Sequence, residues 1–227
     1  MEENIKESLS RLGQRILEMA RNELYIHMRF LDVALSSFLY EPDLSIRCVA
    51  TDGIHMFFHP VMLGNVFQKN RTWVNRSYLH MVLHCILHHV TRRGRREKIL
   101  WNLACDIAVE SIIDHWYLKC VHFPQTRLRK DIYDQLSKAM KVLTAEGIYR
   151  QLAGWNLEED KIRELAAEFQ KDEHGYWPDD PKQEMHQEVE NRWKNISEKT
   201  ETDMETFSSE QSSQAGDLMG QIRVENR

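Results

Sequence analysis

One apolar stretch with three regularly spaced histidines constrains this chain more than any other feature. The stretch covers residues 77–91, and it places His80, His84 and His88 four residues apart. Residues at this spacing stack on one face of a helix, so the sequence predicts a helix with a single stripe of imidazoles. Nearly all other residues of the stretch are apolar, which indicates a helix buried on all sides. Buried imidazoles need polar partners, and a metal ion can bind two of them at once.

A second apolar stretch, residues 99–114, carries acidic groups at the same spacing. Its polar residues recur every four positions and share one face: Asn102, Asp106, Glu110 and Asp114. Because Asp106 lies among residues that should be buried, it needs a partner of its own. An acidic stripe that follows a histidine stripe predicts a metal site between two helices. The alternative interpretation is that the histidines hydrogen-bond within the core and the acidic stripe faces solvent.

The histidine spacing corresponds to part of a zinc-hydrolase motif. In His-Glu-x-x-His helices two histidines bind zinc, and the glutamate acts as general base on the zinc-bound water. Here the segment reads His80-Met81-Val82-Leu83-His84, so the ligand spacing is present and the glutamate is absent. Methionine cannot accept a proton from water, and the usual mechanism is therefore not available.

The third ligand of such a site has to come from another element. A catalytic zinc site has three protein ligands and one open position. His88 would force three ligands onto one straight helix, and His89 is expected on the opposite face, so we predict Asp106 as the third ligand. Glu110, one turn further along, has three alternative roles: a fourth ligand, a group that hydrogen-bonds a ligand, or a displaced catalytic base.

Composition indicates a globular, cytoplasmic protein. The 227 residues are 42% hydrophobic and 29% charged, which suffices for a domain with a sizeable core. The net charge of −5 argues against nucleic-acid binding, which depends mainly on neutralising phosphates. We find neither a signal segment nor an apolar run long enough for a membrane. The scattered cysteines are expected to be reduced thiols: Cys48, Cys85, Cys105 and Cys120.

The remaining sequence predicts a mainly helical α+β domain. Asp52-Gly53 separates two short β-prone runs, which predicts a tight hairpin and a small antiparallel sheet. From residue 197 the composition changes to Ser, Thr, Glu and Gln, which cannot build a core. We therefore predict one domain over residues 1–196, followed by a polar linker or disordered tail over residues 197–227.

Several short pieces occur in a fixed order along the chain: residues 50–53, 59–60, 80–89, 101–106, 144–149 and 172–177. This ordered set resembles the bacterial metallopeptidase-like domain that lies on the amino-terminal side of von Willebrand factor A-like proteins. The resemblance implies a zincin-like fold with zinc bound by His80, His84 and Asp106. It also implies a downstream von Willebrand A-like domain and a partner AAA+ ATPase of the MoxR type.

The resemblance does not extend to the catalytic glutamate, because Met81 stands in its place, and Glu110 stands where the family usually has asparagine. We therefore expect a zinc-binding domain related to metallopeptidases, with weak or no peptidase activity. One alternative is an active zinc metallopeptidase that uses Glu110 as base on a peptide or protein substrate. The other is a non-enzymatic interaction module that works with the von Willebrand A-like domain and the ATPase.

Overall fold

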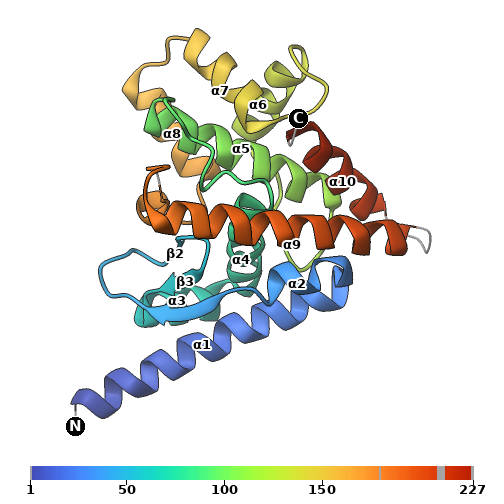
Figure 1. Cartoon of the computed structure of the whole chain (residues 1–227). Helices are drawn as coiled ribbons and strands as arrows, with labels where there is room; N and C mark the ends of the chain where they lie inside the picture. Colours follow the sequence, from blue (N-terminus) through green and yellow to red (C-terminus); the bar gives the residue numbers. More distant parts are fainter. Residues whose placement is uncertain (1, 179, 209–212, 226–227) are drawn as a thin grey trace.

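Helices make up most of this computed structural model, which describes residues 2–178, 180–208 and 213–225 (Figure 1). The helices are α1 (Glu2–His27), α2 (Asp32–Leu35), α3 (Pro60–Lys69), α4 (Arg71–Ile86), α5 (Lys98–Trp116), α6 (Arg127–Ser137), α7 (Ala145–Gly154), α8 (Glu159–Phe169), α9 (Glu184–Ser208) and α10 (Ser213–Glu225). The 3-10 turns are η1 (Arg29–Leu31) and η2 (His174–Tyr176), and the strands are β1 (Leu39–Pro42), β2 (Val49–Thr51) and β3 (His55–Phe58). The predicted α+β, mainly helical fold class is confirmed.

The small sheet has the strand order β1-β3-β2. Strands β2 and β3 form the predicted antiparallel hairpin, and Gly53 in its turn has a φ of 92°, which suits glycine. Asp52 supports the turn by accepting hydrogen bonds from the backbone N–H groups of Ile54 and His55. Strand β1 pairs with β3 in parallel, so the sheet is mixed rather than wholly antiparallel. The expectation of a wholly antiparallel sheet was wrong, because the sequence has a turn signal only for the β2–β3 hairpin and none that indicates how β1 pairs.

The two informative helices, α4 and α5, lie at the centre of the molecule. Most residues of both helices are buried, including all of Val74–Ile86 in α4, as their apolar sequences predict. The Asn70 side chain caps the start of α4, and the Glu97 carboxylate caps the start of α5 by accepting two backbone hydrogen bonds. Figure 1 shows α1 and α3 on one side of this pair, α6, α7 and α8 on the other, and α9 across them.

The histidine helix ends earlier than its sequence predicts. Helix α4 stops at Ile86, and His88 has a left-handed backbone with a φ of 59°. The His89 N–H bonds the carbonyl of His84 and the His88 N–H bonds that of Cys85, which is the hydrogen-bond pattern of a Schellman helix end. His88 is therefore not part of the helical stripe, and His89 turns back toward α4 instead of facing away from it.

The carboxy-terminal segment, which we expected to be a polar linker or disordered tail, is helical where the structure describes it. Helix α9 continues to Ser208, and α10 packs against it. Three apolar side chains that lie far apart in this polar sequence are fully buried: Met204, Leu218 and Ile222. Because these apolar residues are few and widely spaced, the composition of the segment did not indicate that it packs against the core. The domain boundary at residue 196 stays a prediction.

Among the helices of the described segments, none combines the length and apolar character needed to cross a bilayer.

Candidate metal centre

The three predicted ligands meet in the core between α4 and α5. The Nε2 atom of His80 lies 3.0 Å from Oδ1 of Asp106, and the Nε2 atom of His84 lies 3.3 Å from the same oxygen. The two Nε2 atoms are 2.8 Å apart. The spacing of four residues on α4 aligns the imidazoles, and α5 brings the carboxylate against them. The structure thus brings together the residues that the sequence singles out.

Two further donors come from the segment between α8 and α9. Oδ1 of Asp172 lies 3.5 Å from Nε2 of His80. The Nε2 atom of His174 lies 3.1 Å from that oxygen and 3.2 Å from Oδ1 of Asp106. One donor atom from each of the five residues falls within 4.8 Å of the others, and all five side chains are buried. This donor cluster consists of His80, His84, Asp106, Asp172 and His174.

Sequence reasoning missed Asp172 and His174, although the matched piece at residues 172–177 contains both. The two residues lie in an irregular segment, where no helical or strand spacing assigns a face to a side chain. The pattern Asp-x-His within an ordered set of family pieces is the signal that could have found them.

The geometry of the donor cluster suits a metal ion. Zinc lies about 2.0–2.2 Å from its nitrogen and oxygen ligands, so two of its ligands are at most about 4.4 Å apart. The six distances quoted above for single pairs of atoms are 2.8–3.5 Å and fall below that limit. In addition, the Nε2 atoms of His80 and His84 face each other, and at most one neutral imidazole can donate in such a pair. A cation at the common point would satisfy these atoms together.

The charges around the cluster also match a divalent cation. Four buried carboxylates lie in or beside the cluster, Asp106, Glu110, Asp114 and Asp172, together with the buried guanidinium groups of Arg76 and Arg129. Arg76 and Arg129 each bridge Glu110 and Asp114, which compensates these two carboxylates. Within the described part of the chain, the carboxylates of Asp106 and Asp172 form ion pairs with histidines alone, and the nearby Lys171 lies closest to Glu110. Because isolated buried charges are costly, these two negative charges favour an ion of opposite charge.

The pKa values of the cluster histidines reflect the same demand for positive charge. Burial lowers the pKa of His174, but the carboxylates of Asp106 and Asp172 outweigh burial and raise that pKa to about 10. Burial and the neighbouring His80 lower the pKa of His84 to about 3, so its imidazole is neutral and available as a ligand.

Glu110 holds a ligand in place. Its Oε1 lies 2.9 Å from Nδ1 of His80, on the opposite side of the ring from the donor atom. Arg76 and Arg129 donate hydrogen bonds to the same carboxylate. Burial raises the pKa of Glu110, and the opposing effects of Arg76 and His80 bring it well below its ordinary value. A carboxylate bound in this way orients the imidazole and fixes its tautomer.

The other highlighted residues lie outside the cluster. Met81 is fully buried in the hydrophobic core. His89 places its Nδ1 3.0 Å from Nδ1 of His84, so it lies behind a ligand, which we had not expected. Arg76 also escaped notice in the sequence, although it lies four positions before His80 and thus continues the same stripe of α4.

The donor cluster is closed to solvent in this structure. The indole ring of Trp177 stacks on the ring of His174 with centroids 3.9 Å apart, and it also contacts His84.

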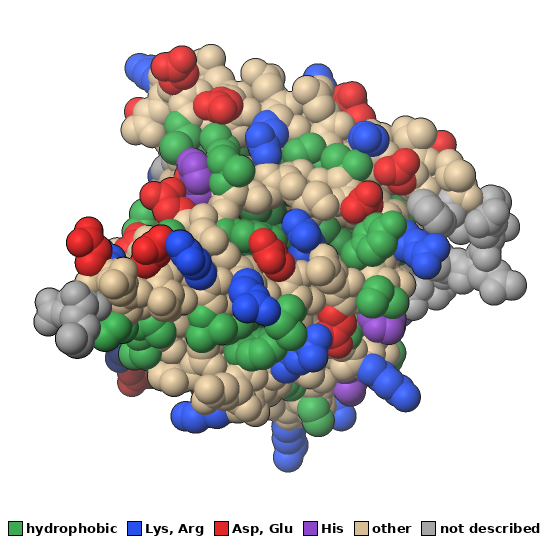
Figure 2. Space-filling model, turned by 90° about the horizontal axis from the view of Figure 1, so that it is seen from below, with side chains coloured by type: hydrophobic (Ala, Val, Ile, Leu, Met, Phe, Trp, Pro, Cys, Tyr) green, Lys and Arg blue, Asp and Glu red, His purple; other side chains and the backbone are tan. Residues whose placement is uncertain are grey.

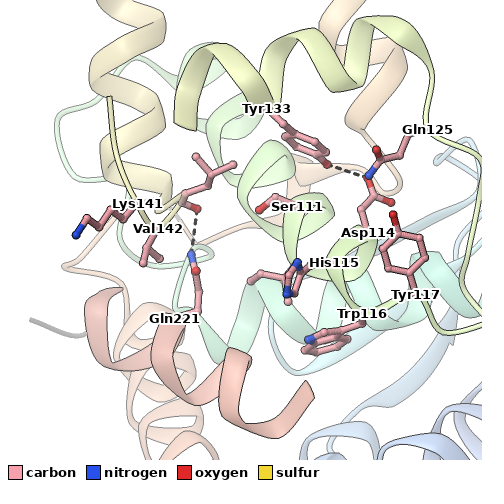
Figure 3. Close-up of a pocket in the computed structure, with 12 residues that line it drawn as sticks. Ser111, Asp114, His115, Trp116, Tyr117, Gln125, Tyr133, Lys141, Val142 and Gln221 are labelled. Atoms are coloured by element: carbon pink, nitrogen blue, oxygen red, sulfur yellow. Dashed lines mark hydrogen bonds between the residues drawn. The ribbon is translucent and has the colours of Figure 1, made fainter. Parts of the chain in front are cut away.

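A cavity of about 420 Å³ lies away from the donor cluster, at the carboxyl end of α5 (Figure 3). Tyr133 donates a hydrogen bond to Asp114 there, and none of the five donor residues lines that cavity.

Comparison with known families agrees with this arrangement. The model of the family described as "Putative metallopeptidase domain" matches residues 14–223, nearly the whole chain. The chain therefore belongs to this metallopeptidase-domain family. No curated protein and no solved structure matches the chain significantly.

Proposed function

We propose that this chain is a zincin-like, zinc-binding domain that has weak or no peptidase activity. His80, His84 and Asp106 hold the zinc ion in this proposal. The observation that carries the proposal is the buried cluster of five donor atoms within 4.8 Å. Membership of the metallopeptidase-domain family supports it. Bound zinc acts as a Lewis acid and lowers the pKa of a water molecule bound to it.

Zinc is the metal that the donor set favours. Imidazole nitrogen is a good ligand for zinc, whereas magnesium and calcium prefer oxygen atoms alone. Two histidines with one carboxylate also suit iron(II). Elemental analysis of the protein purified without added metal distinguishes these ions directly.

The expected lack of hydrolysis follows from the surroundings of the donor cluster. Met81 stands where a His-Glu-x-x-His helix has its base, and its thioether accepts no proton. Glu110 is a poor substitute, because arginines and His80 occupy its oxygens and it lies behind the imidazole. General acid–base help commonly contributes about 10²–10⁴ in rate, and this chain lacks it.

The decisive experiment compares four proteins: native, Met81→Glu, Met81→Leu and Glu110→Gln. Each is assayed for metal content and for cleavage of an unfolded protein such as casein. We expect zinc in the native protein and no cleavage by the native, Met81→Leu or Glu110→Gln proteins. Met81→Glu is the variant in which cleavage can arise. Native cleavage that disappears in Glu110→Gln would instead establish the alternative of an active peptidase with Glu110 as base.

A non-enzymatic interaction module is the second candidate, and an exposed row of apolar side chains on α1 favours it. Ile5, Leu12, Met19 and Ile26 recur every seven residues and are 42–68% exposed. Figure 2, seen from the side of α1, shows hydrophobic side chains between charged ones. Such a row suits a partner helix. A von Willebrand A-like domain and a MoxR-type AAA+ ATPase are the proposed partners.

This second candidate has its own test. Leu12→Asp would abolish co-elution with a purified MoxR-type ATPase, and Leu44→Asp, at an exposed leucine that does not belong to the row on α1, is the control.

We also propose that the domain is located in the cytoplasm. Its four cysteines form no disulfide in the structure, which supports a reducing compartment.

A further inference from the structure

The five donors of the cluster are held in two different ways. His80, His84 and Asp106 lie on the central helices, whereas Asp172 and His174 lie on the irregular segment of residues 171–177, here called the strap. Three protein ligands suffice for a catalytic zinc site, in which the next position belongs to water or substrate. The two donors of the strap therefore occupy places that an outside ligand would otherwise take.

Supporting hydrogen bonds fix the helical histidines and not the strap donors. The Nδ1 atom of His80 is paired with Glu110, and that of His84 is paired with His89. By contrast, Nδ1 of His174 and Oδ2 of Asp172 are buried and have no hydrogen-bond partner among the residues that the structure describes. Partners behind a metal ligand hold its orientation and strengthen its binding. The strap donors are accordingly the weaker and more exchangeable ligands.

Two largely buried side chains, Lys171 and Trp177, anchor the ends of the strap. Its middle is held by the stacking of Tyr176 on Phe57 and by a few hydrogen bonds. The Glu173 N–H bonds the carbonyl of Val49 at 3.0 Å, as a single bridge to the edge of β2. The Glu173 carboxylate accepts a hydrogen bond from the N–H of Arg47. The Tyr176 hydroxyl donates to Asp43. The middle of the strap therefore depends on few hydrogen bonds, and segments of this kind open at a lower free-energy cost than the core does.

Space for movement lies directly beside the strap. A cavity of about 260 Å³ is lined by Lys171, Asp172 and Glu173 of the strap, together with Arg47, Cys48 and Trp73 among others. The cavity begins at the buried Asp172, so a displaced strap would connect solvent to the donor cluster.

We propose that the strap is a reversible closure of the metal centre. In the closed state Asp172 and His174 complete the coordination of the metal ion. In the open state His80, His84 and Asp106 keep the ion, and an outside oxygen ligand takes the vacated positions. This inference rests on the proposed metal-binding function, and it adds the regulation of access to the same site.

Chelator-driven metal loss tests the closure. Zinc-loaded native protein, Tyr176→Phe and Glu173→Ala are mixed with excess EDTA, and zinc release is followed with a chromogenic indicator. Each variant loses one strap contact without touching a donor atom, so we expect release about five- to tenfold faster than in native protein. Tyr117→Phe, at an exposed tyrosine on the end of α5, is the matched control and should release zinc at the native rate.

Removal of single donors provides the second measurement. His174→Ala should retain about one equivalent of zinc and release it faster, whereas His84→Ala should purify without it. Acetohydroxamate, a bidentate oxygen ligand for zinc, should bind His174→Ala more tightly than it binds native protein. Unchanged release rates in the strap variants, or loss of zinc from His174→Ala, would contradict the reversible closure but not the proposed metal-binding function. Absence of metal from native protein would overturn both the strap and the proposed function.

Discussion

Glu110 and His80 are joined by a 2.9 Å contact between Oε1 and Nδ1, in a site from which solvent is excluded. This contact links the donor cluster to a network of buried charges. Arg76 and Arg129 hold Glu110 and Asp114 in place, and Glu110 in turn holds the imidazole of His80. The orientation of a ligand on α4 therefore depends on an arginine of α6, far from it in the sequence.

Replacing Glu110 tests this linkage. Glu110→Gln removes the negative charge that orients His80, so we expect zinc affinity to fall about 10- to 100-fold. The melting temperature should fall as well, because Arg76 and Arg129 lose a buried partner. Asp114→Asn is the control, since Asp114 shares both arginines but makes no contact with His80. It should lower the melting temperature with little change in zinc affinity. Equal affinity in native and Glu110→Gln proteins would contradict the orienting role.

Chelation of the metal should destabilise the fold. A ligand that binds only the folded state stabilises it, so EDTA should lower the melting temperature measured by circular dichroism. His84→Ala should reproduce this loss and show no further response to EDTA. His88→Asn is the matched control, because His88 comes from the same stretch of sequence, lies outside the donor cluster and has a left-handed backbone that asparagine tolerates. A melting temperature of native protein that is indifferent to EDTA would favour histidines that merely hydrogen-bond in the core.

The central part of the site was predictable from the sequence because regular helices convert spacing into geometry. His80, His84 and Asp106 were found in this way, as was the hairpin around Asp52-Gly53. The spacing argument fails where the helix ends. The left-handed backbone of His88 reverses the chain, and His89 consequently lies beside His84 instead of opposite to it.

The rest of the site could not be predicted, because it depends on contacts between distant segments. Asp172 and His174 reach the donor cluster from an irregular segment whose path is set by the bridge from Glu173 to β2. Arg129 lies in α6, and nothing in the local sequence indicates its pairing with Glu110. Helix periodicity does not encode such pairings.

The cysteine thiols should resist modification in the folded protein. Cys85, Cys105 and Cys120 are buried, and burial raises the pKa of the half-buried Cys48 to about 12. Because the thiolate is the reactive form, Ellman's reagent at pH 8 should modify these thiols slowly in native protein and all four after denaturation. The rate at which Ellman's reagent modifies Cys48 should keep rising above pH 9, whereas the rate for an ordinary thiol levels off there.

The raised pKa of Cys48 also predicts a pH dependence of stability. Because the Cys48 thiol keeps its proton to higher pH in the folded state than in the unfolded state, the free energy of unfolding should fall as the pH rises from about 9 toward 12.

The turn of the hairpin should tolerate no side chain. A Cβ atom on Gly53 would lie 2.6 Å from a methyl group of Val189 on α9, and the φ of 92° is unfavourable for alanine. The indole of Trp193 donates a hydrogen bond to the Gly53 carbonyl, so a shift of the turn would also disturb α9. We expect Gly53→Ala to lower the free energy of unfolding by about 2–4 kcal/mol in urea titrations. Gly64→Ala is the control, because its new methyl group would meet no atom within 4 Å and alanine favours the helix α3. That variant should gain up to about 1 kcal/mol, and equal stability of the two variants would show that the turn is not packed against α9 as described.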